Sequence, residues 1–391
     1  MYSKKAGLLI YLILGVSSYL GASPIRFNIL AKRFYSTKWT RFFIRITTVV
    51  CTVQLLFSTY CLYKSPPLTK HSTPDEVFTF NSVYIAAMCL ILPVICFLLL
   101  SFRGDAIARS LTQTLRYSKD IESKWCSFTT LEEFRGYPTQ FILETLLRFF
   151  ILLGVATSFV TSTAVVLHQI FPNNWISLVP KKYWNSPMLW ANYISEAYLM
   201  TICPVGVVTT CSVITFPLAF SLPFYDEFCV NPKSGRRMTL PGFQSPDVLP
   251  KEYRKFEQLH NQYMPIFGPM LIPFQAMVMQ YSMISNLMLK HYWGTLGILR
   301  LVLISMEVGL IVFWIIVLEI SGRYYAASKR NKESWRQFGE QNKLLRKWRK
   351  SVRYIYAGYE GYHVIKRLSV LKFLNGIVRG TFRIFLTFND D

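Results

Sequence analysis

The chain has 391 residues, of which 52% are apolar and 16% aromatic, and its mean hydropathy is +0.29. This composition is typical of an all-helical, polytopic membrane protein with one domain over 1–391, and it leaves no folded soluble module of ordinary size. The net charge of +22 is common among nucleic-acid-binding proteins. Because no soluble basic domain remains, we expect no nucleic-acid partner.

Residues 1–45 are predicted to form a cytoplasmic N-terminal segment. Lys4 and Lys5 precede the apolar run 7–14 and a stretch of small residues, a pattern that resembles a signal peptide. Cleavage would leave the basic residues of 26–41 outside, against the charge distribution of the rest of the chain. We therefore expect residues 1–23 to form an uncleaved short helix that lies under the membrane, with a signal peptide as the alternative.

Seven segments are predicted to cross the lipid bilayer. Six are apolar runs about as long as the roughly 20 helical residues that a bilayer core requires. The seventh carries Lys372, Arg379 and Arg383, so hydropathy alone would reject it. The predicted spans lie near 46–63, 83–102, 149–171, 198–222, 264–289, 301–318 and 368–388.

The distribution of lysine and arginine supports the seventh span and sets the orientation. Of the 43 such residues, thirty-three lie in 1–45, 102–146, 224–263 and 322–367. The intervening gaps contain Lys64, Lys70, Lys181, Lys182, Lys290 and Arg300. Because basic loops stay in the cytoplasm, we predict a multi-pass plasma-membrane protein with a cytoplasmic N-terminus and an extracellular C-terminus.

The cytoplasmic segments have helical periodicity, so we expect several spans to continue as helices below the bilayer. Segment 322–367 is predicted to be a cytoplasmic anchor, with one helix over Trp335–Tyr356. Its apolar stripe consists of Trp335, Phe338, Leu345, Trp348, Val352 and Ile355. Basic residues cover the other faces, so the helix either rests on anionic lipid or packs into a cytoplasmic bundle or subunit interface.

Enzymatic motifs are absent from the sequence. The five histidines are far apart and have no C-x-x-C partner, and there is no G-x-S-x-G, P-loop or G-x-G-x-x-G. We therefore expect no enzyme, no catalytic residue, no metal and no cofactor.

Two carboxylates are candidate functional groups. Glu307 stands alone in the sixth span, where exposure to hydrocarbon costs several kcal/mol. It is either functional, paired with Arg379 or Arg383, or a protonated carboxyl with a local hydrogen bond. Glu196, near the outer start of the fourth span, either lines an outward-facing pocket or is a wet interfacial carboxylate.

The fifth span contains Pro265, Pro269 and Pro273 on one face. Each proline frees a backbone carbonyl, which a neighbouring helix or cavity water must satisfy. We therefore expect this span to border a cavity or to move.

The last predicted helix has one polar stripe, because Lys372, Asn375, Arg379 and Arg383 recur at spacings of three and four. A helix with such a stripe cannot face lipid all round. It must face a bundle interior or a water-filled path, and a central pore shared by several subunits is a natural arrangement.

Short motifs occur at both ends of the chain. They are Leu8-Leu9-x-Tyr11, Gly15, Tyr19-Leu20-Gly21, Pro24 and Arg33-Phe34-Tyr35-Ser36, then Lys350-Ser351-x-Arg353, Gly358, Leu371, Leu374, Ile377 and Thr381-Phe382-x-x-x-x-Thr387-Phe388. Together with seven helices and an internal N-terminus, they resemble the arthropod gustatory and odorant receptor superfamily, and gustatory receptors most. The family usually ends in Thr-Tyr, five apolar residues and Gln-Phe, so Phe382, the shorter spacing and Thr387 are departures.

The resemblance implies a chemosensory, ligand-gated, non-selective cation channel that a small-molecule tastant or odorant opens. It also implies a homotetramer, or a heteromer with a related subunit, around the last helix, with the cytoplasmic anchor where subunits meet. For the ligand pocket, among spans two to six, we select Tyr84, Trp190, Tyr193, Glu196 and Tyr198. For the pore and gate we select Asn375, Arg379, Thr381, Arg383, Phe385, Thr387 and Phe388.

A basic stripe on the last helix is unfavourable for cation passage. Either Arg379 and Arg383 turn into the bundle toward acidic partners such as Glu307, or the ion selectivity is unusual. The alternative functions are a multi-pass solute transporter and a G-protein-coupled receptor, although the latter requires an extracellular N-terminus.

Overall fold

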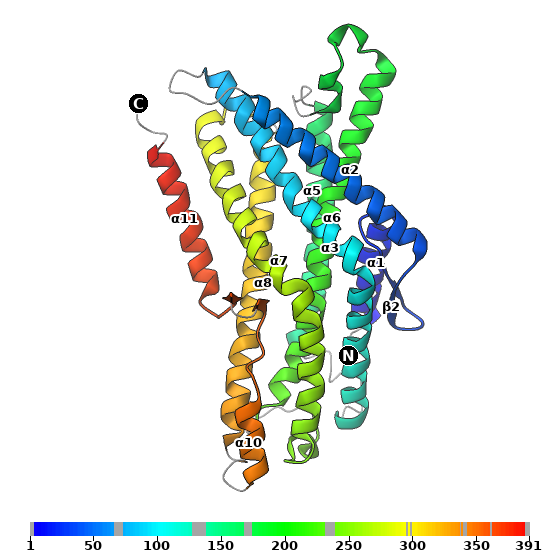
Figure 1. Cartoon of the computed structure of the whole chain (residues 1–391), viewed down its shortest axis with the longest axis vertical. Coiled ribbons are helices and arrows are strands. Elements are labelled where there is room, and N and C mark those ends of the chain that lie inside the picture. Colours follow the sequence, from blue (N-terminus) through cyan, green and yellow to red (C-terminus); the bar gives the residue numbers. More distant parts are fainter. Residues whose placement is uncertain are drawn as a thin grey trace.

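The computed structural model describes residues 4–65, 73–126, 138–167, 174–230, 239–294, 296–297, 299–336, 338, 342–359 and 362–387. The long helices run along the long axis of the molecule, and α2 crosses them obliquely (Figure 1). The helices are α1 (Lys4–Tyr19), α2 (Lys38–Lys64), α3 (Pro74–Trp125), α5 (Pro138–Leu167), α6 (Ser186–Glu227), α7 (Leu249–Tyr292), α8 (Leu299–Ser334), α10 (Lys343–Ser351) and α11 (Ser369–Thr387). Short 3₁₀ helices cover Trp175–Leu178, Lys181–Tyr183 and Pro241–Gln244. Two antiparallel hairpins pair β1 (Ile25–Asn28) with β2 (Arg33–Ser36), and β3 (Gly358–Tyr359) with β4 (His363–Val364).

A helix of the structure corresponds to every predicted span, so the helical membrane fold is confirmed. Within the described residues, four helices are long and apolar enough to cross a membrane, namely those over Lys38–Lys64, Glu76–Trp125, Ser186–Pro217 and Arg300–Ser334. Helices α5, α7 and α11 are outside this group, and residues 168–171 of the third predicted span lie outside the described residues. The count of seven spans therefore stays a prediction.

The helix ends are grouped as the charge distribution predicts. In Figure 1, α2 meets α3 at the upper end, where the C-terminus also lies, and the basic helix α10 lies at the lower end. Helix α3 continues to Trp125 and α8 to Ser334, well beyond the predicted spans. The helical continuation of the spans is therefore confirmed, whereas the sidedness of the two ends stays a prediction.

Helix α1 packs against α5 and α6 instead of lying beneath the bundle. Its residues Ile10 and Leu14 are buried, and the Ser17 and Thr209 hydroxyls are hydrogen-bonded at 2.5 Å. Thr209 belongs to the predicted fourth span, so the C-terminal end of α1 lies beside that span. This apolar helix buries its surface between two neighbours, and its position relative to the membrane stays a prediction.

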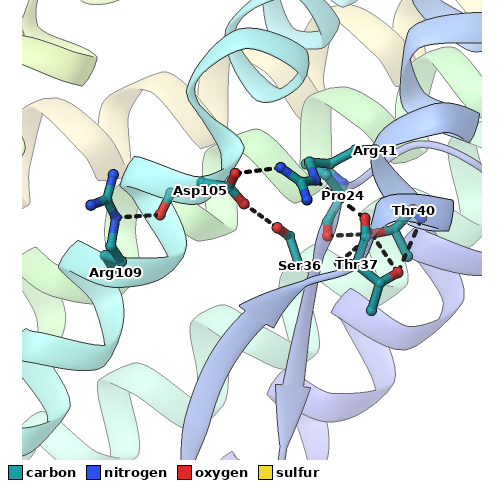
Figure 2. A network of polar contacts seen from close by, with 7 residues as sticks. All are labelled: Pro24, Ser36, Thr37, Thr40, Arg41, Asp105 and Arg109. Carbon is teal, nitrogen blue, oxygen red and sulfur yellow. Dashed lines mark hydrogen bonds and ion pairs between the residues drawn. The ribbon is translucent and has the colours of Figure 1, made fainter.

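The β1–β2 hairpin attaches the N-terminal segment to α3. The Phe34 backbone N–H donates to Thr112 Oγ1 at 3.0 Å, and that hydroxyl is within 3.1 Å of the Phe34 carbonyl oxygen. Figure 2 shows Asp105 of α3 between Ser36, which donates a hydrogen bond, and Arg41, whose guanidinium lies 2.7 Å from the carboxylate. These contacts fix the start of α2 relative to α3.

An aromatic cluster joins α6, α7, α8 and α10 at the lower end of the molecule. Its members are Tyr225, Phe228, Tyr253, Phe256, Tyr324, Trp335 and Trp348. The Trp335 ring lies 4.8 Å from the Tyr253 ring and 4.8 Å from the Trp348 ring, and its Nε1–H donates to the Phe228 carbonyl at 2.9 Å. Trp335 therefore connects two long helices to α10.

The single helix predicted over Trp335–Tyr356 was wrong. Helix α8 ends at Ser334, α10 begins after Asn342, which caps it by accepting the Leu344 N–H at 2.8 Å, and 352–356 is not helical. Trp335, Val352 and Ile355 are buried, and Phe338, Leu345 and Trp348 are half-buried. The regular spacing arises because successive segments turn apolar side chains toward the same cluster.

His260 of α7 should make the stability of the folded chain depend on pH. Its ring lies 5.8 Å from the Tyr324 ring and 6.5 Å from the Tyr356 ring. Burial lowers the pKa of His260 from 6.5 to about 4. As the pH falls, His260 is therefore protonated at a higher pH in the unfolded chain than in the folded chain. The contribution of His260 to stability is full above pH 6.5 and decreases below it. We expect His260 to contribute a loss of about 1.5 kcal/mol between pH 6.5 and 5.

Thermal unfolding of the purified chain at several pH values measures this effect. The His260→Gln variant should lose that part of the pH dependence, and His291→Gln, which changes an exposed histidine, should keep it. Identical pH profiles for the wild type and His260→Gln would show that His260 is not responsible.

Candidate functional site

A cavity of about 240 Å³ lies among α2, α3, α5, α6, α7 and α8. Its wall is mainly aliphatic and sulfur-containing, with residues such as Cys89, Cys203, Met277 and Met306. An apolar cavity with a few polar groups is the usual form of a small-molecule site. The cavity is therefore the candidate ligand site.

The polar part of the cavity wall includes Asn174, Tyr193 and Glu196. Glu196 is 3% exposed, and its Oε1 has no hydrogen-bond partner among the described groups. The alternative of a wet interfacial carboxylate is therefore wrong. Glu196 instead places an acidic group in an otherwise apolar space.

The structure brings two of the five predicted pocket residues to the cavity, namely Tyr193 and Glu196. Trp190 is 67% exposed, and Tyr198 donates its hydroxyl proton to the Leu20 carbonyl at 3.1 Å, so it contacts the N-terminal segment. Tyr84 stacks on a neighbouring ring of its own helix and is not part of the cavity wall.

Sequence reasoning missed most of the wall because it searched for aromatic residues. Met277, Tyr281 and Met288 of α7 line the cavity at spacings of four and seven, which places them on one helical face. Methionine fills irregular apolar space well. However, similar aliphatic and sulfur-containing faces occur in every predicted span, so spacing alone could not single out this one.

Helix α7 separates the cavity from α11. Met277 and Tyr281 line the cavity, whereas Met279 lies so close to α11 that a Cβ added at Gly376 would be 2.6 Å from its Cε. Met283 contacts Gly380 one turn later in the same way. The span with three prolines thus borders the cavity, as predicted, and also supports the last helix.

Helix α11 directs its polar stripe away from the bundle. Phe373 and Ile377 are buried, whereas the four polar residues of the stripe are exposed: Lys372, Asn375, Arg379 and Arg383. Because the two arginines point away from α7 and α8, the expectation that they turn into the bundle was wrong. The stripe is therefore exposed on the surface of the single chain.

The other predicted gate residues have different environments. Thr381 and Phe385 are half-buried, and the Phe385 ring lies 4.5 Å from the Lys290 ammonium of α7. Thr387 ends α11, and Phe388 lies outside the described residues. The predicted pore set therefore does not form one face.

Glu307 has a local partner. Its Oε1 accepts a hydrogen bond from Asn286 Nδ2 of α7 at 3.1 Å, and the residue is 8% exposed. The predicted ion pair with Arg379 or Arg383 is not formed among the described residues. The alternative of a carboxyl with a local hydrogen bond agrees with this arrangement.

No protein-family model and no curated protein matches the chain. Two solved structures match it over nearly its whole length. The insect olfactory receptor OR5 from Machilis hrabei in complex with eugenol has a TM-score of 0.61 and 10% identity, covering 97% of this chain and 97% of that one. A second structure of OR5 has a TM-score of 0.59 and 10% identity, covering 98% and 96%. The chain therefore has the helical membrane fold of the insect olfactory receptor.

Proposed function

We propose that the chain is a subunit of a chemosensory receptor that acts as a ligand-gated ion channel. The observation that carries this proposal is the position of α7, which lines the apolar cavity with Met277 and Tyr281 and supports α11 with Met279 and Met283. The fold shared with an olfactory receptor supports the same function.

A small-molecule stimulus in the cavity would act on α11 through α7. Pro265, Pro269 and Pro273 interrupt the hydrogen bonds of α7, so its two ends can change their relative angle. Any shift of Met279 or Met283 displaces α11, because glycines allow these helices to approach closely. The ligand opens the channel if it binds the displaced state more tightly.

The uncovered stripe of α11 supports an assembly around a shared axis. Charged side chains are unfavourable in lipid, so Lys372, Arg379 and Arg383 would line a water-filled path in a homotetramer or in a heteromer with a related subunit. Permeating cations would follow this path. Leu345 and Trp348 of the anchor are half-buried and would contact neighbouring subunits at the cytoplasmic end.

The test is to record from the purified full chain in planar bilayers with a panel of small apolar molecules. A receptor channel gives discrete current steps whose open probability rises with the stimulus, and the particle is a tetramer with α11 at its axis. Solute flux without current steps would support the transporter alternative.

Monomeric or dimeric particles would contradict the shared pore. An extracellular N-terminal tag, tested by protease protection, would contradict the proposed orientation.

Replacing Arg379 with Gln should raise the cation conductance of the channel. A unit charge about 8 Å away in water opposes a cation by about 0.5 kcal/mol before screening, and four related charges by about 2 kcal/mol. Physiological salt reduces this barrier to about 0.8 kcal/mol, so we expect about a fourfold increase in single-channel conductance. Arg254→Gln removes an equal charge from the exposed cytoplasmic surface of α7 and should leave conductance unchanged. Equal conductance of wild type and Arg379→Gln would place this residue outside the ion path.

A further inference from the structure

Glu196 is a buried acid, and no described residue supplies it with a positively charged partner. It lines the cavity and is 3% exposed, and no Lys, Arg or His is among the described residues of the cavity wall. The described ion pairs do not include it, and its Oε1 accepts no hydrogen bond from the described groups. A buried carboxylate is strongly unfavourable unless a charge and hydrogen-bond donors compensate it.

Asn192 makes the same part of α6 more polar. It precedes Glu196 by one helical turn, so the two side chains project from the same face of the helix. Asn192 is 1% exposed, and neither its Oδ1 nor its Nδ2 has a hydrogen-bond partner among the described groups. Two adjacent buried side chains therefore have unused hydrogen-bonding capacity, which is rare in a folded protein unless a ligand or water uses it.

The chemistry of this site favours an organic cation over the other occupants. Apolar cavities of this kind stay dry, so water is a poor partner for the whole space. Within the described residues no group of three acidic, Cys or His side chains is placed to hold a metal ion. A primary ammonium supplies the missing charge and three N–H donors, and its hydrocarbon part matches the apolar wall.

We propose that the cavity selects small primary amines, with the ammonium paired with Glu196 and the apolar part of the ligand lying between α3, α7 and α8. An apolar cavity of about 150 Å³ accommodates benzene, so the cavity of about 240 Å³ has room for a ring with a short amine chain. This inference rests on the proposed function of the cavity as the stimulus site. It adds the chemical class of the stimulus.

The test compares amines with alcohols that have the same carbon skeleton, such as 2-phenylethylamine and 2-phenylethanol. Isothermal titration calorimetry at pH 7, with the full chain in lipid nanodiscs, should show at least tenfold tighter binding of the amine. In Glu196→Gln the affinities for the amine and the alcohol should differ by no more than about twofold, mainly because amine binding is weaker. Glu319→Gln removes a carboxylate from a surface pair with Arg323 and should keep the wild-type ratio.

Glu196→Asp keeps the charge and should retain a reduced amine preference, which provides a second test if Glu196→Gln does not fold. Equal binding of amine and alcohol by the wild type, no binding of either, or an undiminished preference in Glu196→Gln would overturn the proposal. Amine binding without channel currents would leave the amine site in place but contradict the channel. Currents that amines and alcohols open equally well would support the channel but contradict the selectivity of the cavity for amines.

Discussion

Replacing Trp335 with Ala should destabilise the protein by about 3 to 5 kcal/mol, because it deletes a large aromatic side chain from a packed core. Trp335 is 1% exposed, and its ring contacts both Tyr253 and Trp348 at 4.8 Å. The change also removes the indole donor from the Phe228 carbonyl. We expect a lower melting temperature of the purified chain and the release of α10 from the lower end, detected as faster amide hydrogen exchange in 343–351.

Two further variants separate packing from hydrogen bonding at this position. Trp335→Phe keeps a ring but leaves the Phe228 carbonyl without its donor, so it should be less destabilising than Trp335→Ala. Trp39→Ala deletes the same side chain from a site that is 71% exposed, and it should change the melting temperature little. Equal melting temperatures for Trp335→Ala and Trp39→Ala would show that the aromatic cluster does not hold the lower end together.

The sequence was sufficient to predict where helices lie but not how the segment 335–356 folds. Apolar runs and charge distribution identified segments such as 83–102 and 368–388 because length and hydropathy act locally along the chain. The break at Asn342 escaped detection. A helical repeat in the sequence is the same whether it belongs to one helix or to two segments that face one cluster.

The candidate site was predictable only in part, because the sequence pattern of one helix does not show which faces of separate helices meet. Glu196 and Tyr193, two of the predicted pocket residues, do line the cavity, and such polar groups stand out in an apolar span, but their role in ligand binding stays a prediction. The rest of the wall, including Cys203 and Met288, is formed by ordinary apolar residues from separate helices. Which of their faces converge depends on helix rotation and crossing, and these are set by tertiary packing that hydropathy does not encode.

The link between the β3–β4 hairpin and the long helices depends on Gly268 and Gly322, which the sequence motifs do not include, and on Gly358, which they do. A Cβ added at Gly268 of α7 would overlap the Gly358 carbonyl oxygen of β3, and a Cβ added at Gly322 of α8 would lie 2.8 Å from Arg367 Cα. Both obstacles are backbone atoms, so no side-chain rotation can relieve them. Gly358 itself has a φ of +147°, which side-chain-bearing residues rarely adopt. The chain that leads into α11 is therefore seated directly on α7 and α8.

Gly268→Ala should consequently destabilise the protein by about 3 kcal/mol, at the upper end of the range for overpacking, because the β3–β4 hairpin must move as a unit. The movement reaches Ser369, where α11 begins, so we also expect altered channel gating, measured as a changed open probability without ligand. Gly15→Ala makes the same change in α1, where nothing lies within 4 Å of the added Cβ, and it should be neutral or slightly stabilising. If Gly268→Ala melted and gated like Gly15→Ala, the hairpin would not be held against α7, and the cytoplasmic anchor would have to act on α11 by another route.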